Sequence, residues 1–322
     1  MEEKSTTLNE RFGKIPVESG LTRKMRVHQG WWRTNVLNLE PGFNPLNAND
    51  NVCNTILDGH INTKNFLTPN SFKAVIETLE ARSKEDPGMI DKDRLFNNLL
   101  SSQPLCFNFF GEVKSNPDFG LKVLQTFYPD ITKLISTNFE FAPKENYMKD
   151  RSAFDVAFEV EAGKLIGLIG FECKYTDTFS YKPKESKIYY GDKGNKNHDT
   201  YLEIYNKSKV RFIKPYYDFV QNKNFNQLFR NQLIAEAVMQ NKKFDFVRTG
   251  LFYYQKDDSA KKIAEEFKLM LSDSDNFKPI TYSDFISNVQ QLELSWELRE
   301  WTMLLWARYC GTTLSEETVN RL

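Results

Sequence analysis

The sequence has few cysteines and few histidines, and neither forms a recognisable motif. Among 322 residues there are four Cys and three His. The cysteines lie tens of residues apart with no CxxC pair and no Cys/His cluster, which argues against a zinc site or a disulfide framework and favours reduced thiols. No histidine stands in a metal or nucleophile motif. Acid–base chemistry, if present, should therefore use carboxylates and lysine.

An excess of one charge and a long apolar run are also absent. Lys and Arg total 43, as do Asp and Glu, so the formal net charge is zero and any basic surface that attracts nucleic acid must be local. The first eleven residues lack the apolar core of a signal peptide, and no stretch approaches the roughly 18 apolar residues of a membrane helix. We therefore expect a cytoplasmic protein with no membrane association.

Apolar and aromatic residues, in contrast, are plentiful. Hydrophobic residues make up 40% of the chain and aromatic residues 14%, a share that a disordered chain would not carry. The length suits one large domain or two modest ones. A packed globular protein is the expectation.

Hydrophobic periodicity predicts most of the regular elements. A helix is expected over 70–83 after a capping segment, and 94–110 should hold a short helix that enters a buried segment and is interrupted at Pro104. Residues 1–68 favour loops and short elements, and the lysine-rich stretch 181–200 favours a mobile loop. Further helices are expected at 119–128, 226–240, 259–271, 282–292 and 297–309, and a strand at 244–254.

The clearest pattern is a hairpin formed by residues 151–160 and 165–175. Phe154, Val156 and Phe158 alternate with polar or small residues, so Asp155 faces away from that apolar row. The second segment is apolar almost throughout, as in a strand buried on both faces. With a turn around 163–164, cross-strand pairing brings Asp155 opposite or nearly opposite Glu172, with Cβ atoms roughly 5 Å apart.

Glu172 and Lys174 are separated by one residue, so both side chains point to one face of the second strand. Two neighbouring carboxylates repel each other, and a divalent cation between them would relieve that repulsion because hard cations prefer carboxylate oxygens. A lysine beside the cation could lower the pKa of a bound water, orient it, or stabilise charge on a phosphate. This combination is suited to phosphodiester hydrolysis.

Asp155 followed by Glu172-Cys173-Lys174 resembles the PD-(D/E)XK nuclease superfamily, in which an Asp at one strand's end precedes an (Asp/Glu)-x-Lys on the next strand. The similarity covers about 100 residues, and Phe154 stands where the motif has Pro. A narrower family of restriction-endonuclease-like proteins is similar in three more segments. These are Arg94-Leu95, the run from Phe107 to Glu112, and the run from His28 to Arg33.

The resemblance implies an α/β fold, a restriction-endonuclease-like α/β/α core around a mixed central sheet. The nuclease core is expected over residues 93–255, with a loop-rich and helical extension over 1–92 and a helical segment over 256–322. Asp155 and Glu172 would bind the metal and Lys174 would be catalytic.

Three further residues look similar to polar residues that superfamily members bring to the site. Glu112 could bind or steer the metal, although a solvated Glu at a helix end is an equal alternative. Gln227 and Arg230 lie three apart on a predicted helix and so share a face, again with a surface role as an equal alternative. Mg²⁺ is the implied cofactor, with Mn²⁺ as a substitute, and DNA the implied partner, with a homodimer left open.

The leading hypothesis is a Mg²⁺-dependent DNA endonuclease of restriction type. The alternative is a non-catalytic nucleic-acid-binding or assembly module that keeps the nuclease fold. For Asp155, Glu172 and Lys174 the simpler interpretation is a surface ion-pair ladder. Trp31 and Trp32 favour hydrophobic cover over base stacking, and the helix around Trp301 favours core over a subunit interface.

Overall fold

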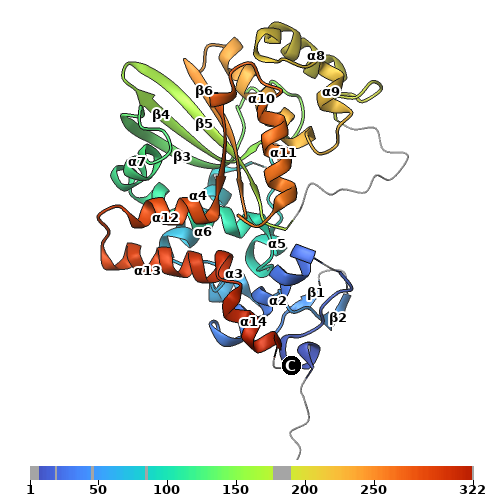
Figure 1. Cartoon of the computed structure of the whole chain (residues 1–322), viewed down its shortest axis with the longest axis vertical. Helices are drawn as coiled ribbons and strands as arrows, with labels where there is room; N and C mark the ends of the chain where they lie inside the picture. The colour runs from blue at the N-terminus through green and yellow to red at the C-terminus, as the bar shows by residue number, and fades with distance from the viewer. Residues whose placement is uncertain (1–6, 19, 45–46, 84–85, 177–189, 321–322) are drawn as a thin grey trace, which may run out of the picture.

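A five-stranded mixed sheet lies between two layers of helices in the computed structural model, which describes residues 7–18, 20–44, 47–83, 86–176 and 190–320 (Figure 1). The strands run in the order β3-β4-β5-β6-β7; β3, β4 and β5 are antiparallel neighbours, whereas β6 and β7 are parallel to β5. Their bounds are β3 Lys133–Phe141, β4 Phe154–Ala162, β5 Leu165–Lys174, β6 Phe246–Tyr253 and β7 Phe277–Thr281.

Each face of the sheet buries its own apolar cluster. Helices α6, α7, α12 and α13 contribute to one cluster, and α8, α9, α10 and α11 contribute to the other. The predicted α/β/α fold with a mixed sheet and helical additions is therefore confirmed. The bounds are α6 Ser102–Ser115, α7 Pro117–Gln125, α8 His198–Lys207, α9 Tyr216–Val220, α10 Asn226–Gln240, α11 Asp258–Lys268, α12 Tyr282–Gln290 and α13 Trp296–Leu305.

The β4–β5 hairpin has the predicted register. Val156 pairs with Phe171 and Ala162 with Leu165, and the turn places Gly163 at a φ of 62°, which glycine adopts without strain. Because side chains alternate along a strand, this register decides which residues of the two strands share a face.

Local sequence signals also located several helices. Helix α4 (Pro69–Ala81) begins after Thr68, whose side chain accepts a hydrogen bond from the Ser71 amide, and α10 has the predicted bounds. The expected interruption at Pro104 is wrong. Helix α5 (Lys92–Asn97) ends before it, and Pro104 lies in the first turn of α6, where a proline's missing N–H is tolerated.

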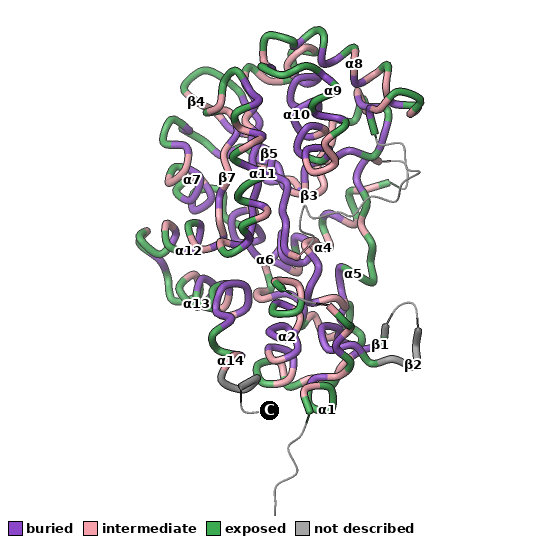
Figure 2. The backbone as a smooth tube through the Cα atoms, turned by 45° about the vertical axis from the view of Figure 1, so that its right-hand side comes forward, coloured by how far each residue is buried: buried purple, intermediate pink, exposed green. Residues whose placement is uncertain are grey.

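The expectation of loops and short elements up to residue 68 is wrong for one long element, helix α2 (Gly20–Asn35). Its polar residues are not a solvated face: His28, Gln29 and Arg33 are buried, as is Trp32. The other elements there are short: α1 Leu8–Phe12, β1 Phe43–Asn44, β2 Asn47–Asn51 and α3 Gly59–Asn62. The buried stretch of α2 is visible near the lower end of the molecule in Figure 2.

Residues 181–189 of the predicted 181–200 loop lie outside the described residues. Residues 190–197 form turns and bends, and the last three positions begin α8. The predicted helix at 297–309 is α13 followed by a π-helical turn, Trp306–Cys310. Trp301 is buried, as favoured, whereas Trp306 is exposed. Beyond residue 255 the chain also supplies β7 to the sheet. Among the described residues, no helix is both long and apolar enough to cross a membrane.

Buried polar contacts connect α2, the π-helical turn and the end of β5. Gln29 Nε2 donates to the Tyr175 hydroxyl at 2.6 Å and to the Arg308 carbonyl at 2.9 Å. The Arg308 guanidinium donates in turn to the Asn65 carbonyl at 2.8 Å. Because Tyr175 directly follows Lys174, segments from both ends of the chain fix the end of β5.

His28 should make folding stability depend on pH. Its ring nitrogens lie 3.0 Å from Ser315 Oγ and 2.9 Å from the Ala307 carbonyl, and burial lowers its pKa from 6.5 to about 4. A lowered histidine pKa means that the unfolded chain binds the proton more tightly. The stability is therefore full above pH 6.5 and falls as the pH drops toward 4, by about 2 kcal/mol between pH 7 and 5.

Urea denaturation of wild type and His28→Gln at pH 7 and 5 measures this difference. In His28→Gln the free energy of unfolding should change much less between pH 7 and pH 5 than in the wild type. His60→Gln, at an exposed position, should keep the wild-type change. An unchanged pH-dependence in His28→Gln would contradict the assignment.

Candidate active site

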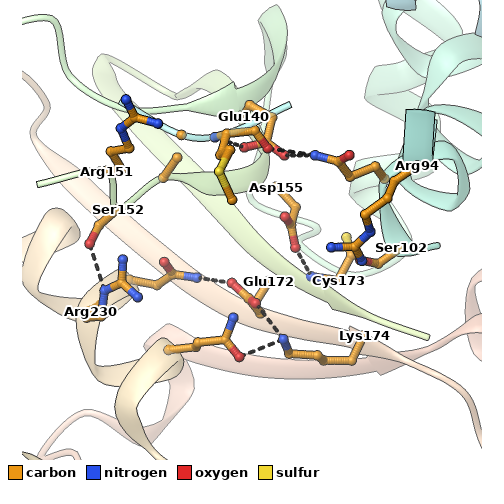
Figure 3. Close-up of a pocket in the computed structure, with 16 residues that line it drawn as sticks. Arg94, Ser102, Glu140, Arg151, Ser152, Asp155, Glu172, Cys173, Lys174 and Arg230 are labelled. Atoms are coloured by element: carbon orange, nitrogen blue, oxygen red, sulfur yellow. Dashed lines mark hydrogen bonds and ion pairs between the residues drawn. The ribbon is translucent and has the colours of Figure 1, made fainter. Parts of the chain in front are cut away.

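A pocket of about 230 Å³ opens where β5 ends, beside the first turns of α10. It is lined by Asp155 from β4, by Glu172 and Lys174 from β5, by Glu140 from β3, and by polar residues of α10 (Figure 3). The structure thus brings the three residues of the predicted motif together in one cavity.

Asp155 lies one residue beyond the last hairpin pair on β4, at the level of Glu172. Its Oδ2 accepts a hydrogen bond from the Cys173 amide at 2.6 Å. Burial raises the pKa of Asp155 well above its usual value, and repulsion from Glu172 and Glu140 raises it further, against the opposing effects of the Cys173 amide and Lys174. The charged form of Asp155 is therefore disfavoured, and a cation beside it would favour that form.

Glu172 and Lys174 form a buried pair, with 6% and 8% of their surfaces exposed. Glu172 Oε1 lies 3.0 Å from Lys174 Nζ, and Glu172 Oε2 accepts from Asn231 Nδ2 at 3.0 Å. Lys174 Nζ also donates to Gln227 Oε1 at 2.6 Å. This burial excludes the interpretation as a surface ion-pair ladder, since the charges have been removed from bulk water.

Alternation along β5 separates the polar from the apolar side chains, as predicted. Phe171, Cys173 and Tyr175 belong to the apolar cluster on the α6 side, whereas Glu172 and Lys174 contact α10 on the opposite side. The strand therefore contributes to the core and to the pocket at once.

Phe154 departs from the predicted alternation of β4. Val156 and Phe158 pack in the cluster on the α6 side, but Phe154 belongs to the cluster on the α10 side. Gly170 makes this possible, because a Cβ at that position would lie 2.5 Å from Cδ1 of Phe154. The aromatic ring thus occupies the space that the glycine leaves beside the pocket.

Glu112 does not line the pocket. It lies in the last turns of α6, is buried, and accepts a hydrogen bond from Asn70 Nδ2 at 2.9 Å. The residues of α6 that reach the pocket are Ser102 and Gln103 at its start. Ten residues of helix separate Ser102 from Glu112, about 15 Å along the axis, so neither the predicted metal contact nor the solvated alternative describes this residue.

The acidic residue that sequence reasoning missed is Glu140, near the end of β3. Its Oε2 accepts from the Met89 amide at 3.2 Å and its Oε1 from Gln103 Nε2 at 3.3 Å. Burial raises its pKa, with a contribution from Glu172. Its φ is 48°, an uncommon conformation outside glycine. The sequence pattern that could have located Glu140 is the strand-like alternation over Lys133–Phe141, for which no element was predicted.

Helix α10 supplies a polar face to the pocket. The predicted residues Gln227 and Arg230 both line it, and so does Asn231, which sequence reasoning missed. Asn231 lies one helical turn after Gln227, so the same spacing argument that paired Gln227 with Arg230 would have included it.

The donor set fits a hard divalent cation. Asp155 and Glu172 offer carboxylate oxygens, and a cation between them would offset the burial and the mutual repulsion that raise the pKa of Asp155. Within the described ranges no group of three or more His, Cys, Asp or Glu side chains is placed to hold a metal. The two carboxylates are thus the acidic ligands to test.

Asp155→Asn replaces a carboxyl by an amide of nearly the same size, so it tests the ionisable group while the shape of the pocket is kept. Without metal, the variant should melt at or above the wild-type temperature, because it replaces a buried carboxyl whose charged form is disfavoured by burial and by Glu172. Mg²⁺ should raise the midpoint of the wild type by mass action but leave the variant unchanged. Thermal melts with EDTA and with Mg²⁺ test both expectations.

Glu112→Gln is the matched control, since it removes a buried carboxylate outside the pocket. It should keep the full Mg²⁺ shift. A Mg²⁺ shift that persists in Asp155→Asn would show that the cation binds elsewhere.

Comparison with known proteins agrees with this geometry. A family model described as the PD-(D/E)XK nuclease superfamily matches residues 16–311. No curated protein and no solved structure matches the chain. The family match spans the helices on both sides of the sheet as well as the hairpin that bears the motif.

Proposed function

Because the chain belongs to the PD-(D/E)XK nuclease superfamily, we propose that it is a Mg²⁺-dependent endonuclease that hydrolyses phosphodiester bonds in DNA, of restriction type. The superfamily is of nuclease type and generally uses divalent metals. The observation that supports the finer proposal is the convergence of Asp155, Glu172 and Lys174 in one pocket, where burial raises the pKa of Asp155 well above its usual value.

Asp155 and Glu172 would hold the cation, with Mn²⁺ as a substitute for Mg²⁺. When bound, the cation would lower the pKa of a water and draw in a phosphate oxygen. Glu172 would exchange its contact with Lys174 for the metal, while Asn231 Nδ2 keeps its other oxygen in place. The strands thus fix the carboxylates before any ligand arrives.

Lys174 would act on the attacking water and on charge that develops at the phosphate. Its ammonium already points into the pocket, held by Glu172 and by Gln227. Gln227 accepts from Lys174, so its role is to orient the ammonium rather than to exchange a proton itself. An ammonium fixed in a half-enclosed site stabilises charge without reorganising during the reaction.

A non-catalytic module that keeps the fold is the second candidate. A degenerate site would be expected to lack one of the three motif residues, whereas Asp155, Glu172 and Lys174 are all present and line one pocket. The choice of DNA over RNA, the homodimer and the cytoplasmic location stay predictions.

Plasmid cleavage by the purified protein tests the proposal. Wild type should cut supercoiled DNA at discrete sites with Mg²⁺ or Mn²⁺ and not with EDTA. Lys174→Ala should slow cleavage by about 100-fold or more, as loss of a charge-stabilising donor does, yet retain the Mg²⁺ shift of the melting midpoint. Because the carboxylates remain in that variant, the melting midpoint reports metal binding and the cleavage rate reports hydrolysis independently.

Glu112→Gln should cleave like wild type. An RNA substrate run in parallel tests the choice of nucleic acid. Cleavage by Lys174→Ala at the wild-type rate would refute the assigned role, and a wild type that binds Mg²⁺ but cuts neither DNA nor RNA would favour the non-catalytic module.

A further inference from the structure

Arg230 is held in the pocket by contacts that leave one edge of its guanidinium available. Nε donates to Ser152 Oγ at 2.8 Å (Figure 3). Cζ lies 4.5 Å from the centroid of the Tyr190 ring. Only 18% of the side chain is exposed. Within the described part of the chain, neither of its two terminal Nη atoms donates a hydrogen bond to another residue. The fixed guanidinium therefore has donors to offer to a ligand.

Behind Arg230 lies Asp150, a carboxylate that is already satisfied by other donors. Its Oδ1 accepts from the Ser152 amide at 2.8 Å, and its Oδ2 accepts from Asn197 Nδ2 at 3.1 Å and from the Tyr201 hydroxyl. Arg230 Nε approaches Oδ2 only to 3.9 Å. The distance is too long for a hydrogen bond, so pairing with Asp150 does not consume the donors of Arg230.

These contacts come from the chain between β5 and α10. Tyr190, Asn197 and Tyr201 all belong to it, and Asp150 and Ser152 belong to the segment that enters β4. The described part of this connection packs on the α10 side of the sheet. Two segments remote in sequence thus converge on one guanidinium, whereas the exposed pocket arginines Arg94 and Arg151 have no comparable burial.

We propose that Arg230 binds a non-bridging oxygen of the substrate phosphate and that Asp150 is its positioning residue, acting through Ser152. A guanidinium presents parallel N–H donors that match phosphate oxygens. Arg230 also lies on the same face of α10 as Gln227, which contacts Lys174. A phosphate in the pocket would then meet the carboxylate-held cation, Lys174 and Arg230. The inference rests on the proposed function, because it assumes a phosphodiester ligand.

Binding of a fluorescent DNA duplex, measured by anisotropy with Ca²⁺ in place of Mg²⁺, tests the anion site without requiring cleavage. Arg230→Ala should weaken binding by about tenfold or more, in line with the loss of charged hydrogen bonds. Arg230→Lys keeps the charge without the planar donors and should recover only part of the affinity. Arg211→Gln, at a partly buried arginine outside this pocket, should bind like wild type.

Chemical rescue distinguishes a ligand-binding role from a structural one. Free guanidinium ion at non-denaturing concentration should restore binding and single-turnover cleavage to Arg230→Ala, because the ion can occupy the space of the lost side chain. It should not rescue Lys174→Ala. Asp150→Asn should lower the cleavage rate while a urea melt shows a folded protein, and it should respond less to guanidinium because its arginine is still present.

The outcomes separate this inference from the proposed function. If the wild type cuts DNA and Arg230→Ala binds and cuts equally well, the inference alone fails. If the wild type binds DNA through Arg230 but cuts nothing, the anion site stands and hydrolysis fails. If Arg230→Ala is folded, binds DNA weakly and is not rescued by guanidinium ion, the role of the residue is structural and the inference fails. If the wild type binds no nucleic acid, both proposals are overturned.

Discussion

Burial of two carboxylates on neighbouring strands is the constraint around which the pocket is built. Asp155 and Glu172 are brought to one level by the register of the β4–β5 hairpin, and that register is fixed because a shift by one residue would turn the apolar rows away from both helical layers. Burial of apolar side chains in the two cores therefore supplies the free energy that keeps these two carboxylates in a buried site. The Cys173 amide and Lys174 oppose the resulting rise in the pKa of Asp155, and Asn231 donates a hydrogen bond to Glu172.

The sheet and helix α10 supply different groups to the site. The hairpin supplies the acidic oxygens, while α10 supplies Gln227, Arg230 and Asn231 at helical spacing to orient or extend them. The outer face of the same helix packs into the apolar cluster formed with α8, α9 and α11. The helix thus places three polar groups as a rigid unit, so a change in its packing would move all three relative to the carboxylates.

Sequence patterns located the parts of the site that depend on local order. The hairpin register, the opposite faces of β5 and the bounds of α10 follow from periodicities that neighbouring residues enforce on one another. Glu140 was missed because its place in the site depends on the pairing of β3. Asp150 was missed because its place depends on Asn197, more than forty residues away along the chain. Glu112 was misplaced because no local signal shows which end of a buried helix meets a pocket. Helix α2 was missed because its polar residues are buried through contacts with the other end of the chain.

The order of the site along the chain has a consequence for its assembly during synthesis. The contact between Asp155 and Cys173 spans 18 residues, whereas that between Lys174 and Gln227 spans 53. Closing the longer loop costs roughly 1 kcal/mol more in chain entropy, and on a ribosome the residues of α10 do not yet exist when the hairpin has been made. The nascent chain can therefore complete the hairpin before the helix that supplies Gln227 and Asn231 has been synthesised, so the burial of Glu172 and Lys174 against that helix is a late step of folding.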